Sequence, residues 1–276
     1  MANEYDNFIP EIWSAAILNE LDKRLVLANV TNQRWAGEIS NVGDTVRILG
    51  VGSVAVSAYT PNSTSITYET PTTSTTSLVI DKDYYAAVQV DDKERLQAVT
   101  DLVSAYAPRI AYGLAKQIDT SIANEYANAG LTGVTATASD DPYDAIVDAR
   151  KDLENSDVEG PFWLVVDPSF AAALRKNTKF VSAEGEGATF RQNGALGSIA
   201  GFNVYESNNL VTDSGEVQCL YGGPNAIAHA RQLIQSSIEA IRLESSFATG
   251  IRARAVWGNK VLRTGGELGV LGYTPS

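Results

Sequence analysis

The sequence predicts an α+β protein, and three stretches of the chain carry that prediction. Residues 92–129 have apolar side chains at helical spacing and predict the longest helix of the molecule. Residues 162–166 are continuously apolar, which is typical of a short strand that is buried on both faces. Residues 237–270 are rich in β-forming side chains. Helical and strand-rich stretches that are separated in this way favour an α+β arrangement.

Composition limits the classes of protein to which the chain can belong. Its 276 residues include 44% hydrophobic and 20% charged residues, which indicates a globular protein of one large domain or two closely packed ones. The net charge of -12 repels phosphate backbones and disfavours sequence-specific binding to nucleic acid. Cys219 is the only cysteine, so the chain cannot form an intrachain disulfide.

We expect neither a membrane segment nor a secretory signal in this sequence. No apolar run approaches the roughly 20 residues that span a bilayer. Residues 1–6 are acidic and polar, and they lack the basic and apolar regions of a signal peptide. The default expectation is therefore a cytosolic location.

The N-terminal third predicts a helix followed by a long β excursion. Residues 11–30 follow Pro10 and carry an apolar stripe, which must dock on the rest of the chain or on another subunit. Residues 42–90 predict two strands, 42–56 and 78–90, on either side of a polar middle rich in Thr, Ser and Pro. That middle is too polar to bury a core. It is either an exposed flexible hairpin or an arm that becomes ordered against a neighbouring subunit.

The long helix at 92–129 contains Pro108, where we expect a kink or a restart. Beyond this proline the apolar side chains recur every four residues, so the stripe drifts around the helix and meets different partners along its length. From residue 109 to residue 129 the helix spans about 30 Å. The side chains of this stripe are Ile110, Leu114, Ile118, Ile122 and Tyr126.

Two helices in the second half of the chain carry clear start signals. Asp141 precedes Pro142 and Asp167 precedes Pro168, in each case an N-cap residue followed by a proline suited to the first helical position. In order, we expect a helix from Pro142 to about Asn155, a helix from Pro168 to Lys176, a glycine-rich loop at 181–200, strands at 202–206 and 217–221, and a short helix near 224–233.

Paired carboxylates are the first candidates for chemistry, and we interpret most of them as structural. The pairs at 91–92 and 140–141 precede predicted helices, where the helix dipole favours negative charge, so capping is preferred over catalysis. The pair at 81 and 83 lacks the further ligands of a calcium loop, which favours a solvated strand edge over a metal contact. The pairs considered are Asp81/Asp83, Asp91/Asp92, Asp140/Asp141 and Glu184/Glu186.

The only histidine and the only cysteine are also interpreted as core residues. His229 lies between alanines and has no neighbouring Cys or His that would complete a metal site or a catalytic triad. Cys219 lies inside a predicted strand and is expected to behave as a small buried hydrophobe.

The glycine-rich stretch 194–201 leads directly into the strand that begins at Phe202. Ser198 follows Gly197 without an intervening residue, so the stretch is not a G-x-S-x-G nucleophile elbow. No lysine follows as in a phosphate-binding loop. We expect a flexible surface loop at a subunit boundary. The sequence therefore predicts no catalytic, cofactor-binding or metal-binding residue, and no enzyme.

The order of these parts resembles the major capsid protein of tailed bacteriophages, from about residue 8 to residue 270. The sharpest local piece is 199–210, in which a glycine and an aromatic residue precede a valine and then a serine. The ending 253–263 is similar to the last strands of that family, although it is less specific.

The resemblance implies a Hong Kong 97-like capsid fold, with an N-terminal arm, an extended hairpin loop, a peripheral domain built on a spine helix, and an axial domain. The implied division is 1–35 for the arm, 36–91 for the extended loop, 92–155 for the peripheral domain, 156–236 for the mainly axial domain, and 237–276 for strands that return to the axial and peripheral domains.

The resemblance also implies a structural function. The protein is expected to self-assemble into hexamers and pentamers of an icosahedral phage head that encloses double-stranded DNA, as a part of the virion that is assembled in the host cytoplasm. The implied partners are other copies, a portal, and packaged DNA that is bound without sequence specificity. Because the chain begins at the arm, without a helical prodomain, a separate scaffolding protein is expected, and a decoration protein stays open.

Two other functions remain as alternatives. An encapsulin-type nanocompartment shares this fold class and would enclose enzymes instead of DNA. A β-rich surface adhesin is suggested by the Thr- and Ser-rich excursion, although the missing signal peptide weakens it.

Overall fold

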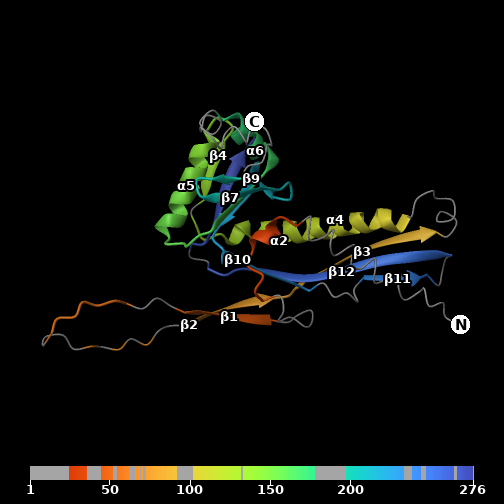
Figure 1. Cartoon of the computed structure of the whole chain (residues 1–276), viewed down its shortest axis with the longest axis horizontal. Coiled ribbons are helices and arrows are strands. Elements are labelled where there is room, and N and C mark those ends of the chain that lie inside the picture. The colour runs from red at the N-terminus through yellow and green to blue at the C-terminus, as the bar shows by residue number, and fades with distance from the viewer. Residues whose placement is uncertain are drawn as a thin grey trace.

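The computed structural model describes residues 25–35, 45–51, 55–61, 66, 68, 70, 73–91, 102–131, 133–177, 197–232, 238–243, 247–263 and 266–275. Figure 1 shows a compact α/β unit, a long helix that lies along a long sheet, and a hairpin that projects away from both. In chain order the elements are α2 (Leu27–Val30), β1 (Thr45–Val51), β2 (Thr73–Val79), β3 (Lys82–Asp91), α4 (Leu102–Ala123), the 3-10 helix Asn124–Asn128, β4 (Val134–Thr137), α5 (Pro142–Asn155), β5 (Phe162–Val166), α6 (Pro168–Lys176), β6 (Ser198–Ile199), β7 (Phe202–Glu206), β8 (Thr212–Asp213), β9 (Glu216–Gly222), β10 (Ile227–Gln232), β11 (Ile238–Arg242), β12 (Ala248–Val261) and β13 (Leu268–Thr274).

The compact unit is a mixed sheet in the order β4-β13-β9-β5-β7-β6, with α5 and α6 on one face. β5 pairs parallel with β7 and antiparallel with β9, and all five of its residues are buried. This confirms the strand predicted at 162–166. Its alternate side chains pack into two different cores. Leu164 packs with α5 and α6, whereas Trp163 and Val165 pack on the side of α4.

Both predicted N-caps form as the sequence indicated. The backbone N–H of Tyr143 donates to the Asp141 carboxylate over 3.0 Å, and the helix that follows begins at Pro142. At α6 the backbone N–H of Ser169 donates to Asp167 over 2.8 Å. Each carboxylate satisfies a donor that has no partner within its own helix.

The central strand of the long sheet is β12. It pairs with β3 along one edge, and along the other edge its N-terminal part pairs with β11 and its C-terminal part pairs with β10. The β12 side chains alternate, so Ile251, Ala253, Ala255 and Trp257 are buried on one face. α4 covers that face, and the predicted stripe from Ile110 to Ile122 lies in the same core cluster as these β12 residues.

The observed long helix differs from its predicted bounds at the C-terminal end. α4 continues through Pro108 without a restart and passes at Asn124 into the 3-10 helix, instead of remaining α-helical to residue 129. Residues 92–101 lie outside the described residues, so the predicted start of this helix is not tested. Most of the helix predicted at 11–30 also lies outside them, and of its described residues, 25–30, only α2 is helical.

Two predicted elements are wrong because strand pairing between distant segments overrides local pattern. The strand predicted at 78–90 is two strands, since β2 pairs with β1 while β3, beyond Asp81, pairs with β12. The short helix predicted near 224–233 is the strand β10. Its register against β12 places alanines 228 and 230 on the base of the hairpin, and this pairing outweighs the helix propensity of alanine.

A buried carboxylate on α4 joins that helix to α2. Asp119 is fully buried and accepts hydrogen bonds from the backbone N–H groups of Val26 at 3.0 Å and Ala28 at 3.3 Å. Burial raises the pKa of Asp119, and the donated hydrogen bonds oppose that shift. The N-terminal segment is thereby held on the same helix that covers the long sheet.

A second buried polar network joins β10, β12 and α4. Asn259 donates through Nδ2 to the Ser121 hydroxyl over 2.7 Å, and its Oδ1 lies 2.7 Å from Nδ1 of His229. Because that oxygen can only accept, Nδ1 of His229 carries the proton. Nε2 is buried and finds no partner among the described residues. Burial, with a further contribution from Arg231, lowers the pKa of His229 to about 4.

The hairpin is attached to the underside of the long sheet at one point. Leu78 and Ile80 are fully buried against Ala228, Ala230 and Val256 in a small apolar cluster. At the same point a Cβ on Gly258 would lie 2.1 Å from the backbone oxygen of Val79. Only glycine permits this approach of the two backbones.

Substitution of Gly258 by Ala is expected to lower the free energy of unfolding by about 1–3 kcal/mol, because the backbone of β2 must move to admit the methyl group. Gly113→Ala is the matched control, since a Cβ there meets nothing within 4 Å on the exposed side of α4, and helix propensity predicts a gain of about 0.5–1 kcal/mol. Urea unfolding of the unassembled subunits measures both. Equal effects of the two substitutions would contradict the close contact at Gly258.

The subunit is expected to lose stability as the pH falls from about 6.5 toward 4, because the folded pKa of His229, about 4, lies below the unfolded value near 6.5. Protonation therefore favours the unfolded chain, and the loss between pH 7 and pH 5 amounts to about 2 kcal/mol. His229→Gln removes this titration but leaves the carboxylates unchanged. If the variant and the parent lose the same stability between these two pH values in urea unfolding, the assignment to His229 fails.

Candidate interaction surfaces

The hairpin carries large apolar side chains that its own chain leaves uncovered. β1 and β2 pair antiparallel from Thr45↔Val79 to Val51↔Thr73, and the chain beyond them extends away from the rest of the molecule (Figure 1). Val56 is 98% exposed and Tyr68 is 91% exposed. The large exposed apolar residues of this excursion are Leu49, Val56, Tyr59, Ile66, Tyr68 and Val79.

Such a surface marks an interaction site. Exposed large apolar side chains are common singly, but a series of them along one projecting element costs hydration free energy that contact with another surface recovers. A two-stranded hairpin is also only marginally stable by itself in water. The middle of the excursion, which the sequence pattern predicted only to be polar, therefore also presents exposed large apolar side chains between its Thr and Ser residues.

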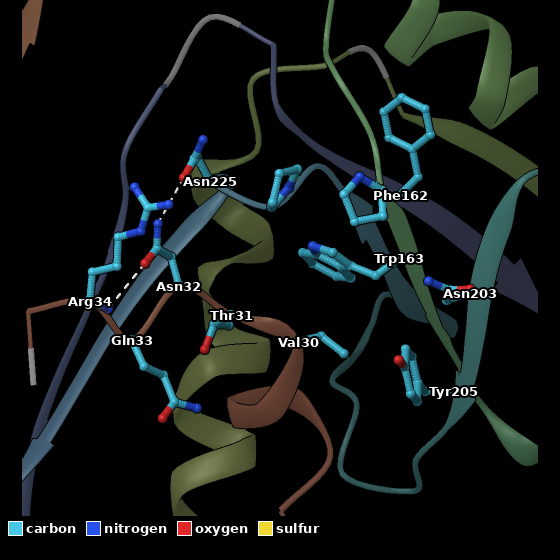
Figure 2. A pocket seen from close by; sticks show the side chains of 12 residues that line it. Val30, Thr31, Asn32, Gln33, Arg34, Phe162, Trp163, Asn203, Tyr205 and Asn225 are labelled. Atoms are coloured by element: carbon cyan, nitrogen blue, oxygen red, sulfur yellow. Dashed lines mark hydrogen bonds between the residues drawn. The ribbon is translucent and has the colours of Figure 1, made fainter.

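A shallow groove of about 340 Å³ lies where the N-terminal segment crosses the compact unit (Figure 2). Its floor contains Trp163 and the rim includes Asn203 and Tyr205, which share a face of the sheet because β5 and β7 pair with Trp163↔Asn203 in register. The groove is lined by Val30, Thr31, Asn32, Gln33, Arg34, Pro161, Phe162, Trp163, Asn203, Tyr205, Pro224 and Asn225.

Hydrogen bonds fix the walls of this groove. Trp163 donates through its indole N–H to the carbonyl oxygen of Gly223 over 2.7 Å. Asn32 donates through Nδ2 to Asn225 Oδ1 over 2.7 Å, and the backbone N–H of Arg34 donates to Asn32 Oδ1 over 3.1 Å. Arg34 is the only charged residue among the described residues of the lining, and its side chain lies at the edge of the groove in Figure 2.

The face of the long sheet opposite α4 carries exposed charged side chains beside the exposed ring of Tyr85. Arg254 donates through Nε to Asp83 Oδ1 over 2.7 Å and makes a second contact from Nη2 to Oδ2, so the pair is bidentate. The hydrogen bond from Arg254 is the main reason that the pKa of Asp83 is lowered. Asp81 pairs with the adjacent Lys82 at 3.1 Å. The structure therefore places the pair at 81 and 83 in exposed ion pairs beside and within β3.

The other paired carboxylates that the structure describes, Asp91, Asp140 and Asp141, do not converge on a site. Asp140 accepts hydrogen bonds from the backbone N–H and the hydroxyl of Thr137, at 2.7 Å and 2.8 Å, which lowers its pKa and fixes the turn before α5. Asp141 caps α5. Asp91 is the last residue of β3 and lies opposite Ala248, whereas Asp92, Glu184 and Glu186 lie outside the described residues.

His229 and Cys219 are both fully buried in the two cores, as the sequence predicted. Burial raises the pKa of the Cys219 thiol to about 12, so at neutral pH it remains a thiol. Among the described residues, no group of three or more His, Cys, Asp and Glu side chains could hold a metal ion. No helix in the same residues is long and apolar enough to cross a membrane.

The end of the glycine-rich stretch is a tight hairpin and not the flexible loop that we expected. β6 pairs with β7, and both Ile199 and Phe202 are buried in the core of the compact unit. Ala200 and Gly201 form the turn with φ of 47° and 83°. The positive φ of Gly201 favours glycine at this position, and the Arg150 guanidinium, which stacks on Phe162, lies in the space where a Cβ would stand. Residues 194–196 lie outside the described residues.

Comparison with known proteins agrees with this fold. A chain of Mycobacterium phage Che8 superposes with a TM-score of 0.74 and 29% sequence identity, over 90% of each chain. A chain of Gordonia phage Cozz gives a TM-score of 0.71 at 12% identity, over 91% of this chain and 86% of that one. The capsid of cyanophage P-SCSP1u gives 0.67 at 16% identity, over 89% and 86%. Comparison with curated protein sequences found no match.

The family model for phage capsid protein matches residues 73–266, which is more than half of the sequence. That family is structural and not enzymatic, which agrees with the scattered carboxylates and the buried histidine and cysteine described above. The chain therefore belongs to the phage capsid protein family, as a tailed-bacteriophage major capsid protein with the α+β, Hong Kong 97-like fold.

Proposed function

We propose that this coat protein self-assembles into the hexamers and pentamers of an icosahedral head that encloses double-stranded DNA. The exposed apolar series on the hairpin carries this proposal, because it needs a surface that its own chain does not supply. In a closed shell every subunit has neighbours of identical sequence, so a self-complementary surface of this kind is satisfied in every copy.

The proposed division of labour follows the segments of the fold. Residues 1–35 form the arm, and 36–91 form the extended loop that lies over an adjacent subunit. Residues 92–155 form the peripheral domain around α4, and 156–236 the mainly axial domain around the β5 sheet. Residues 237–276 form the returning strands, of which β12 belongs to the sheet beneath α4 and β13 belongs to the compact sheet.

The proposed partners are those of a phage head, namely other copies of the chain, a scaffolding protein, a portal and packaged DNA, with a decoration protein left open. The net charge of -12 repels phosphate backbones, so the protein would not hold the packaged DNA tightly. This supports a contact with DNA that has no sequence specificity. We propose the virion as its location, after assembly in the host cytoplasm, and we assign it no catalytic activity. The encapsulin-type compartment and the surface adhesin gain no support from the family model or the solved structures, and we do not propose them.

The protein expressed with its phage scaffolding protein is expected to form closed icosahedral shells, which negative-stain electron microscopy would reveal. Particles from infected cells are expected to protect double-stranded DNA from added nuclease. Protein that remains monomeric at high concentration with its scaffold, or shells that enclose an enzyme and no DNA, would refute the proposal.

Replacement of residues 56–70 by a short Gly-Ser turn is expected to abolish shell formation while the subunit still folds. No described residue of the replaced segment belongs to the three buried clusters, and the β1–β2 ladder and the anchors Leu78 and Ile80 are retained. The free energy of unfolding is therefore expected to change by less than about 1 kcal/mol. As a control, a linker of the original length made of Gly and Ser separates loss of the apolar side chains from loss of reach. Shells that assemble normally from either variant would show that the hairpin is dispensable.

A further inference from the structure

We propose that the groove beside Arg34 receives the hairpin of a second copy of the chain, with Tyr68 against the aromatic floor and Glu69 beside Arg34. This inference rests on the proposed function and makes it specific, since it names the two surfaces that meet. It concerns residues that come from four separate parts of the sequence and that the fold brings together.

The first argument is apolar complementarity. The groove offers the ring of Tyr205, which is 43% exposed, together with Trp163 and the two prolines 161 and 224 in its lining. The hairpin offers Tyr68, whose ring has no cover in its own chain. A cavity of about 340 Å³ accepts one aromatic side chain and parts of its neighbours, and offset or edge contacts between aromatic rings are favourable.

The second argument is charge. In a chain with 20% charged residues, the stretch 52–80 contains a single one, Glu69, directly after Tyr68 in the sequence. Among the described lining residues of the groove, Arg34 is the only charged one, and it is exposed. Glu69 itself lies outside the described residues, and it is the sequence that places it beside Tyr68. The stretch 52–80 and the described lining of the groove therefore carry one charge each, of opposite sign. Such a pair fixes the register of an interface whose remaining contacts are apolar.

The third argument identifies the occupant as a second copy. The base of the hairpin is fixed by Leu78, Ile80 and the Gly258 contact, and from there the hairpin runs away from the compact unit (Figure 1). A hairpin anchored in this direction cannot turn back into the groove of its own subunit. A second copy supplies the same hairpin from outside, and its groove in turn receives the next copy, which is a head-to-tail contact that a ring can close.

A charge-reversal cycle tests the contact. Arg34→Glu and Glu69→Arg are each expected to raise the critical subunit concentration for assembly by about two- to fivefold, the size expected for an exposed ion pair. The double variant is expected to restore the parent value. Lys116→Glu combined with Glu69→Arg is the matched control, since Lys116 is an exposed cation on α4 that lies outside the groove, and it is expected to give no rescue. Sedimentation of assembly mixtures measures the assembled fraction, and thermal unfolding of the free subunits verifies that each variant folds.

Photo-crosslinking identifies the occupant directly. A benzoylphenylalanine at Asn203, on the groove rim, is expected to crosslink in assembled shells to a peptide that contains Tyr68 of another copy, and mass spectrometry would identify it. A crosslink to any other segment, to the N-terminal residues or to another protein would overturn the inference, as would single charge variants that assemble like the parent or a double variant that gives no rescue. In each of these cases the parent still forms shells. Absence of shells from the parent itself would instead refute the proposed function.

Discussion

The packing of α4 along β12 is the constraint on which the rest of the structure depends. The alternating side chains of β12 give the long sheet one apolar face, and the four-residue stripe of α4 covers it. The same helix carries Asp119 and Ser121, whose buried hydrogen bonds hold α2 and link to the His229 and Asn259 pair. Because β12 also pairs with β3 and β10, the N-terminal segment, the hairpin base and the compact unit are all positioned relative to this one helix–strand contact.

The interior and the projecting hairpin differ in how their apolar side chains are covered. Inside the molecule apolar groups are buried against each other, and the buried Asp119 carboxylate accepts hydrogen bonds from backbone N–H groups. On the hairpin, Val56 and Tyr68 remain exposed, with Thr and Ser residues between them in the sequence. Under the proposed function, a change in the hairpin is expected to affect assembly, whereas a change beneath α4 is expected to affect folding.

Local signals in the sequence were sufficient for elements whose causes are local. Asp141 with Pro142 and Asp167 with Pro168 specify helix starts within a few residues, and both helices have the predicted bounds. The division at Asp81 and the strand at 227–232 were not predictable in this way, because each depends on pairing with a partner more than 20 residues away. The groove was missed for the same reason, since Arg34, Trp163, Tyr205 and Asn225 meet only in the fold. The polar middle of residues 42–90 allowed an arm that contacts a neighbouring subunit, and the scarcity of charge between residues 52 and 80 is a further signal of the same kind that the prediction did not use.

The contact between Gly258 and the backbone of Val79 has a mechanical consequence. The hairpin meets the rest of the described chain at a small cluster in which Leu78 and Ile80 pack on two alanines and a valine. Because this cluster lies at one end of a long projecting element, it sets the direction in which the exposed side chains of the hairpin are presented. A substitution that displaces the cluster slightly would therefore displace the distant end of the hairpin much more, while the core beneath α4 keeps its geometry.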